Sequence, residues 1–304
     1  MYLQHFGLNE MPFSLTPNTH FFLNIGSHHE ALNLLLVGLE NAAGFIKIVG
    51  EVGTGKTLLC RKLLNALDEH YVTAYIPNPK LTPAGMRIAL AEELHIKVSR
   101  NEGQHSVLKK ISARLIELAA EGKSVVLLID EAQAMPEETI ESIRLLTNLE
   151  TETQKLIQIV LFGQPELDRL LDRSTLRQLK QRITFAYTLK PLTASSLDLY
   201  INHRLAASGY NGVELFGRAA LKTLYKASEG IPRLVNILSH KALMVAYGKG
   251  DRTITPVHIK RAIEDTEGMK CPGGFSFNRI ALLVASASAA LVLYLVFYLG
   301  RELH

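Results

Sequence analysis

The stretch that decides the fold of this chain is Gly50-Glu51-Val52-Gly53-Thr54-Gly55-Lys56-Thr57. It fits the pattern G-x-x-x-x-G-K-[ST], a loop that binds phosphate groups. An apolar run before it, residues 45–49, predicts a buried strand, and leucines at helical spacing follow it. Glycines let backbone N–H groups curl around phosphate oxygens, and the helix N-terminus adds partial positive charge.

These residues therefore predict a nucleotide site rather than a glycine turn that only joins a strand to a helix. All eight residues from Gly50 to Thr57 are expected to surround the phosphates. Lys56 is expected to reach the β- and γ-phosphates, and the Thr57 hydroxyl to bind Mg²⁺.

An acidic pair, Asp130 and Glu131, follows a second apolar run at residues 125–129. This is a Walker B pattern, in which Asp130 holds Mg²⁺ and Glu131 orients and deprotonates the attacking water. An acidic pair after a strand is, by itself, more often an ordinary charge pair at a helix entry. Its position downstream of a phosphate loop favours the catalytic interpretation, with ATP and Mg²⁺ as the bound groups.

Gln164 follows a third apolar run at residues 156–162 and stands where a polar side chain could contact the γ-phosphate or water. The alternative is a loop glutamine without a role. One basic helix is expected next, before a closing strand at residues 184–189. Its cations are Arg169, Arg173, Arg177, Lys180 and Arg182.

Beyond residues 190–193 the chain predicts helices only. Arg233 is unusual there, because a cation at a helix start opposes the helix dipole unless it faces phosphate. Before the loop, aromatic and proline residues suggest an extended segment that either lines a base pocket or simply packs on the core. Ser27 is expected to start a helix with a capping box. His28 and His29 are expected on its surface.

Bulk properties narrow the classes of function. The chain has 304 residues, which is enough for one large or two ordinary domains. Its net charge is +4, and it has no basic arm that would indicate nucleic-acid binding. Its two cysteines lie far apart in the sequence and indicate a reducing compartment. Its first residues lack the basic and apolar regions of a signal peptide. The uncharged run Ile280–Leu299 reaches about 30 Å as a helix, which predicts one transmembrane span rather than a buried core helix.

Several of these segments together resemble the ExeA/GspA-type ATPases of bacterial secretion and type IV pilus systems, within the AAA+ superfamily. Among these the chain most resembles the ATPase of MSHA-type pilus biogenesis. The resemblance is carried by Tyr2, His5-Phe6-Gly7-Leu8, Pro12-Phe13, Gly44-Phe45, the phosphate loop, Leu128-Ile129-Asp130-Glu131-Ala132-Gln133, Gly163-Gln164-Pro165-Glu166-Leu167, Leu179, Gln181-Arg182-Ile183, Gly230 and Pro232-Arg233.

The resemblance implies an α/β fold of the P-loop NTPase (AAA+) class: a parallel sheet in strand order 5-1-4-3-2, a helical lid and ring-like homo-oligomers. It also implies roles: Gln164 as sensor 1, Arg182 as the arginine finger and Arg233 as sensor 2. Arg177 competes with Arg182 for the finger. The expected units are an N-terminal segment packed on the core (1–40), the ATPase core (41–190), the lid (191–268), a linker (269–279) and the span (280–299).

The expected function is that of a membrane-anchored ATPase that supports assembly or positioning of a pilus or secretion complex. It implies a single-pass protein of the bacterial inner membrane with its ATPase domain in the cytoplasm and assembly proteins as partners. Only a short tail follows the span, so direct binding to the cell wall, as in longer relatives, is not expected. Two alternatives are a DNA-associated ATPase resembling the transposition helpers TniB and IstB, which the span disfavours, and a nucleotide switch with negligible turnover, which the intact acidic pair disfavours.

Overall fold

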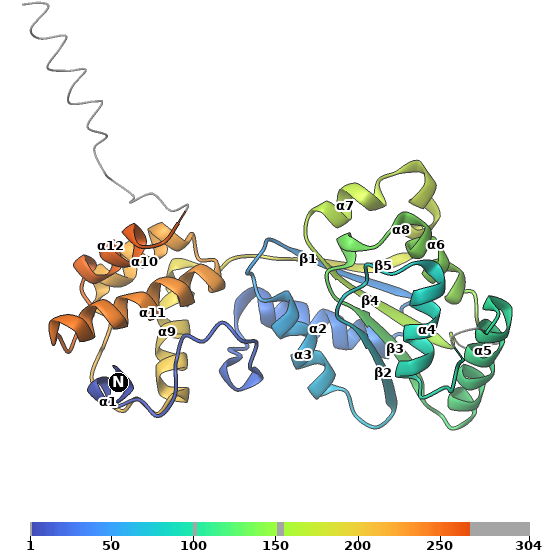
Figure 1. Cartoon of the computed structure of the whole chain (residues 1–304), viewed down its shortest axis with the longest axis horizontal. Helices are drawn as coiled ribbons and strands as arrows, with labels where there is room; N and C mark the ends of the chain where they lie inside the picture. Colours follow the sequence, from blue (N-terminus) through green and yellow to red (C-terminus); the bar gives the residue numbers. More distant parts are fainter. Residues whose placement is uncertain (1, 100–101, 151–154, 268–304) are drawn as a thin grey trace, which may run out of the picture.

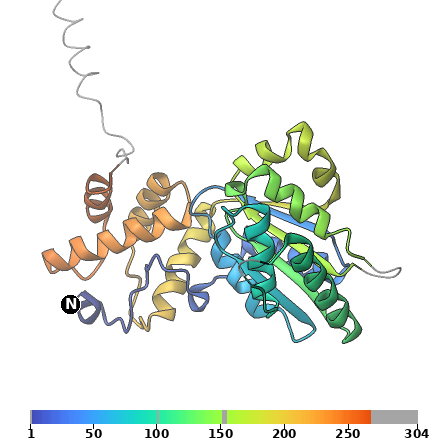
Figure 2. The same ribbon diagram turned by 45° about the vertical axis from the view of Figure 1, so that its right-hand side comes forward.

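The computed structural model describes residues 2–99, 102–150 and 155–267. They form an α/β part and a separate helical part, which lie at opposite ends of the molecule in Figure 1. The turned view in Figure 2 shows the same division, with the N-terminal segment passing from the helical part to the α/β part.

A five-stranded parallel sheet forms the centre of the α/β part. Its strands are β1 (Phe45–Gly50), β2 (Tyr71–Ile76), β3 (Ser124–Ile129), β4 (Ile157–Gly163) and β5 (Ile183–Leu189). The order across the sheet is β2-β3-β4-β1-β5, which confirms the strand order that the family resemblance implies.

Helices cover both faces of this sheet, which is why its inner strands are apolar without interruption. In β3, Val125, Leu127 and Ile129 face one core cluster, whereas Val126 and Leu128 face the other. On the first face lie α4 (Pro83–Glu93), α5 (Gln104–Ala120), α6 (Glu137–Leu146), α7 (Glu166–Leu171) and α8 (Arg177–Arg182). On the second face lie α2 (Gly26–Glu40) and α3 (Lys56–Ala66).

The helical part has a hydrophobic core of its own. It contains α9 (Ala194–Ala207), α10 (Arg218–Ser228), α11 (Pro232–Lys249) and α12 (Pro256–Glu264). The Thr193 side chain caps α9 by accepting a hydrogen bond from the Ser196 N–H, as its position before the helix predicts.

The N-terminal segment is divided between these two cores. Its first residues form a short helix, α1 (Tyr2–Phe6), where the sequence predicts irregular chain. Phe6 and Phe13 are buried in the helical core, whereas Phe22 is buried with α2 against the sheet. We expected residues 1–40 to pack on the ATPase core as one segment, but residues 2–40 join the two parts.

Two local expectations are wrong. Helix α2 begins at Gly26 without a side-chain cap, and the Ser27 hydroxyl instead accepts a hydrogen bond from the Lys190 N–H. The predicted single basic helix is broken into α7, a 3-10 turn at Ser174–Leu176 (η3) and α8. Leu171, Leu176 and Leu179 are each buried against the sheet, and the break brings all three leucines inward.

The predicted transmembrane segment, Ile280–Leu299, lies outside the described residues, as does the predicted linker. Among the helices within residues 2–267 that the structure describes, none combines the length and apolarity that a membrane crossing requires.

Candidate nucleotide site

The phosphate loop joins the end of β1 to the start of α3, as predicted. Gly53 and Gly55 adopt left-handed backbone conformations, with φ of +84° and +99°. A Cβ atom on Gly53 would lie 2.6 Å from Arg233 Cβ, and one on Gly55 would lie 2.9 Å from His28 Nε2. Both positions therefore exclude side chains for conformational and steric reasons.

The Lys56 ammonium lies inside this loop. Its side chain is buried, and Nζ donates to the Gly50 carbonyl (2.7 Å) and the Glu51 carbonyl (3.0 Å). Burial lowers the pKa of Lys56, while nearby carboxylates, Glu131 first among them, oppose that shift. The amine is thus placed where its positive charge can meet phosphate oxygens.

Neighbouring residues hold the loop in shape. The Thr54 hydroxyl donates to the Glu51 carbonyl (2.8 Å), and His28 Nε2 donates to the Thr54 carbonyl (2.9 Å). The expectation that His28 is a surface residue is wrong, because its side chain is only 9% exposed and burial lowers its pKa. His29, by contrast, is exposed and contacts Asn33.

The acidic pair follows β3, which lies two strands away from β1 in the sheet. The sheet order places the ends of β3, β4 and β1 side by side, so Asp130 comes close to Thr57. The Thr57 hydroxyl donates to Asp130 Oδ2 over 2.6 Å, and the Glu131 N–H donates to Asp130 Oδ1 over 2.9 Å. Burial raises the pKa of Asp130, whose side chain is 3% exposed.

These two oxygen-bearing side chains fit Mg²⁺, which prefers hard oxygen ligands and nucleotide phosphates. Thr57 and Asp130 would hold the ion. When bound, Mg²⁺ neutralises charge on the phosphates. A buried carboxylate whose charge is disfavoured by desolvation gains from a nearby cation, which agrees with this assignment.

Glu131 lies beside Asp130 in a left-handed backbone conformation, with φ of +51°. Such conformations are uncommon for residues other than glycine and gather at functional sites. Its Oε2 accepts hydrogen bonds from the side-chain amides of Gln133 (2.6 Å) and Gln164 (2.9 Å). Gln133 Oε1 in turn accepts from the Gln164 N–H (3.0 Å).

The two glutamines thus form a clamp on the Glu131 carboxylate. Gln164 was expected near the γ-phosphate, and the structure brings it to the predicted base. Gln133 was not singled out for a role by sequence reasoning. The available signals were its position two residues after the acidic pair and its place in the run that carries the family resemblance.

The helical part closes the site from the other side. The Arg233 backbone N–H donates to the Gly53 carbonyl over 3.1 Å, so the start of α11 rests directly on the phosphate loop. A cavity of about 310 Å³ lies between the two parts. Its lining comprises Ser14–Asn18, Val52, Gly53, Gly55–Leu58, Glu131, Gln164, Tyr200, Arg204, Pro232, Arg233 and Asn236.

Arg182 does not line this cavity. It ends α8, is half-buried, and donates to the Thr147 hydroxyl over 3.0 Å. Arg177, at the start of the same helix, is exposed, and within the described residues its guanidinium has no hydrogen-bond or ion-pair partner. The structure therefore does not bring either arginine to the nucleotide site of its own chain.

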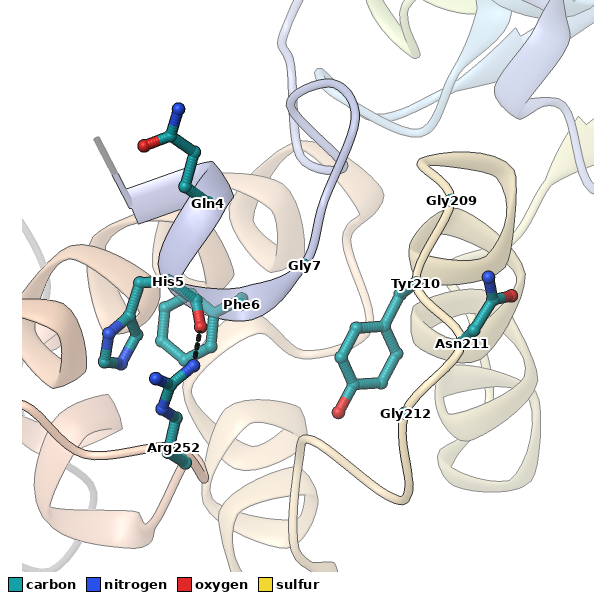
Figure 3. A pocket seen from close by; sticks show the side chains of 9 residues that line it. All are labelled: Gln4, His5, Phe6, Gly7, Gly209, Tyr210, Asn211, Gly212 and Arg252. Carbon is teal, nitrogen blue, oxygen red and sulfur yellow. Dashed lines mark hydrogen bonds between the residues drawn. The ribbon is translucent and has the colours of Figure 1, made fainter.

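A second hollow of about 450 Å³ lies on the helical part, away from the phosphate loop. It is bounded by α1, the turn at residues 209–212 and Arg252, which donates to the His5 carbonyl (Figure 3). None of the predicted site residues lines it.

Comparison with known proteins agrees with this geometry. Residues 22–171 match the AAA domain family. The chain has the P-loop AAA+ fold. The fold of this chain is similar to that of Cdc6p from Pyrobaculum aerophilum, with a TM-score of 0.66, 18% identity and coverage of 88% of this chain and 73% of that one. The ORC2 protein of Aeropyrum pernix has a TM-score of 0.63, 15% identity and coverage of 86% and 73%. At these identities the likeness concerns the fold alone.

A closer sequence relative is the general secretion pathway protein A of Aeromonas hydrophila. It is 41% identical over 292 residues, which cover 96% of this chain and 53% of the relative. This chain thus spans about half the length of that relative. The similarity supports the ExeA/GspA-type resemblance.

Proposed function

We propose that this chain hydrolyses ATP in a Mg²⁺-dependent reaction at the cavity between its two parts. The observation that carries the proposal is the placement of Glu131, whose carboxylate lines the same cavity as Lys56 and Thr57. A carboxylate at this place can orient and deprotonate water for attack on a phosphate held by the loop.

Each remaining site residue has a role in this proposal. Residues 50–57 bind the phosphates, and Thr57 with Asp130 holds the metal. Gln164 and Arg233 line the cavity and supply polar contacts to the γ-phosphate and water. An arginine from a neighbouring copy, Arg182 or Arg177, completes the site, which requires a ring-like homo-oligomer.

The cellular task that we propose is support of a secretion complex or a type IV, MSHA-like pilus. The relative is named for the general secretion pathway, and this name supports the secretion part of the proposal. No such support exists for the DNA-associated alternative, which is therefore not favoured. The partners would be assembly proteins of the inner membrane.

We further propose that Ile280–Leu299 anchors the chain in the bacterial inner membrane, with the ATPase domain in the cytoplasm. The support is the uncharged run itself and the need of a phosphate loop for cytoplasmic ATP. Basic residues Lys270 and Arg279 precede the run, which agrees with this orientation.

The decisive test of the chemistry is Glu131→Gln in the full chain, purified in detergent. This variant keeps the shape of the side chain but loses the base, so ATP binding should persist while hydrolysis falls by about 10²–10⁴-fold. Turnover close to wild type would remove Glu131 from the mechanism. Protease added to spheroplasts tests the topology, because digestion of the ATPase domain from outside would refute the proposed orientation.

A further inference from the structure

A short segment of the N-terminal region, residues 12–18, crosses from the helical part to the sheet and is called the strap here. Two arginines hold its carbonyl groups. Arg204 of α9 donates from Nε to the Pro12 carbonyl (2.5 Å) and from Nη2 to the Ser14 carbonyl (3.3 Å). Arg61 of α3 donates to the Pro17 carbonyl (2.7 Å). The strap is therefore fixed to the helical part at one end and to the sheet at the other.

Arg204 is an unusual residue for this task. Its side chain is only 4% exposed. Among the residues that the structure describes, no carboxylate forms an ion pair with it. Its other contacts include the Tyr200 hydroxyl (3.0 Å), the Tyr200 ring (centroid 5.5 Å from the guanidinium carbon) and the Phe21 ring (4.6 Å).

A buried cation without a counter-ion is costly unless its donors are well satisfied. The fixed fork of Arg204 is satisfied chiefly by strap carbonyls, so its orientation and that of the strap depend on each other. The position of the strap relative to α9 is thus set by one side chain rather than by apolar packing alone.

The same network continues to the phosphate loop. The Tyr200 hydroxyl donates to Asn236 Oδ1 (3.0 Å), one turn after Arg233 in α11. The Arg233 N–H then contacts the Gly53 carbonyl. Tyr200, Arg204 and Asn236 all line the nucleotide cavity together with strap residues Ser14–Asn18. Side-chain hydrogen bonds from the strap to Asn236, the first turns of α11 and the bond from Arg233 to Gly53 therefore connect the strap to the loop along one wall of that cavity.

We propose that Arg204 is a positioning residue for nucleotide binding: it fixes the strap to the helical part, so that the strap, α9 and α11 close on the base and sugar as a single wall. This inference rests on the proposed nucleotide function. The phosphate loop already accounts for the phosphates, so this wall acts on the part of the ligand that a bare polyphosphate lacks.

The test is to compare binding of ATP, ADP and inorganic tripolyphosphate, each with Mg²⁺, to the full chain in detergent. Arg204→Met should weaken ATP and ADP binding about 10- to 100-fold, because bonds from a charged group are lost. Tripolyphosphate binding should not change, since it needs only the loop. The kcat at saturating ATP should stay within about twofold, because the wall does not act on the γ-phosphate.

Arg204→Lys should fail to restore ATP affinity, because a single ammonium cannot replace the two-pronged contact to Pro12 and Ser14. Tyr200→Phe is a milder variant that keeps the ring and loses only the bridge between Arg204 and Asn236. It should weaken ATP binding several-fold, again without an effect on tripolyphosphate, and it tests the proposal even where Arg204→Met fails to fold. The matched control is Arg218→Met, an exposed arginine of α10, which should leave all three affinities unchanged.

Two results would overturn the proposal: ATP affinity like wild type in both Arg204→Met and Tyr200→Phe, or equal losses for ATP and tripolyphosphate, which would indicate general damage. A wild-type chain that binds neither ligand would instead refute the nucleotide function itself. The two failures are therefore distinguishable.

Discussion

The two ends of the nucleotide cavity are built in opposite ways. The phosphate end comes from one continuous stretch, residues 50–57, shaped by left-handed glycines and buried Lys56. The other end comes from three segments far apart in the chain, residues 14–18, 200–204 and 232–236, joined by side-chain hydrogen bonds. Local backbone geometry forms the first end, and tertiary contacts form the second. Substitutions should therefore change the contribution of one end to ligand binding without changing that of the other.

The largest expected effect is at the phosphate end. Lys56→Ala removes the cation that neutralises the β- and γ-phosphates, so binding of ATP and of tripolyphosphate should both fall below detection. Isothermal titration with both ligands measures this. The control is Lys62→Ala in the same helix, α3, which does not line the cavity. Retained tripolyphosphate binding in Lys56→Ala would show that the two ends are not separable in this way.

The next effect concerns an arginine that neither end of the cavity supplies. We predict that Arg182→Ala binds ATP normally but hydrolyses it about 10³-fold more slowly, as expected for a finger that acts on a neighbouring copy. Mixing this variant with Lys56→Ala should restore part of the activity, because mixed rings pair an intact loop with an intact finger.

The structure also identifies the arginine to test if Arg182 is not the finger. Arg182 is half-buried and bonded to Thr147, whereas Arg177 is exposed. Wild-type hydrolysis by Arg182→Ala in a verified oligomer would transfer the role to Arg177. Arg177→Ala should then show the slow turnover and the rescue by mixing.

A smaller effect is expected at the glutamine clamp. Gln133→Ala removes one of two amides that orient Glu131 and also frees the Gln164 N–H. We expect kcat to fall about tenfold with ATP affinity unchanged, since an orienting contact and not the base is lost. Gln178→Ala, at an exposed position of α8, is the control. A change in ATP affinity alone would place Gln133 in binding instead.

The smallest effect is a pH-dependent change in stability. Burial raises the pKa of Asp130 in the folded chain. The ionised carboxylate therefore destabilises the fold at pH values above that pKa, and this penalty disappears as pH falls below the ordinary aspartate range. Asp130→Asn should thus melt about 1–2 °C higher than wild type near pH 7, a change that corresponds to roughly 1 kcal/mol in a chain of 304 residues.

That advantage should shrink as pH falls below the raised pKa of Asp130 and vanish below about pH 3, where the wild-type carboxyl is protonated in both the folded and the unfolded state. Melting curves of both proteins without Mg²⁺, recorded from about pH 3 to pH 8, measure the difference. An equal gain at both ends of this range would assign it to packing rather than to charge. The variant should also lose hydrolysis, because it lacks the metal-binding carboxylate.

The contrast between the two ends also explains how far sequence reasoning reached. The loop, the acidic pair and the strands before them are contiguous patterns with their own physical logic, and the structure contains them where predicted. Gln164 lines the cavity because it follows the strand next to β1 in the sheet, and its contact with the γ-phosphate or water stays a prediction. The strand order itself came from a family resemblance and not from periodicity.

The features that the sequence did not predict share one cause, because contacts between distant segments position the residues concerned. The sequence predicts a surface position for His28, whereas in the fold His28 is buried and donates a hydrogen bond to the Thr54 carbonyl. In the sequence Arg204 resembles an ordinary surface arginine of a helix, and in the fold the strap covers it. The short helix α1 has no helical signal of its own and packs Phe6 into the helical core. No local pattern encodes these partners.

The contact between Arg233 and Gly53 has one further consequence. Arg233 lies in the first turn of α11, where backbone N–H groups have no acceptor within the helix. Among the described residues, the Gly53 carbonyl is the only acceptor for this amide. Its exchange with deuterium therefore depends on separation of the helical part from the loop and not on fraying of α11. The exchange rate of this single amide should report opening of the cavity directly, in the resting protein and during turnover.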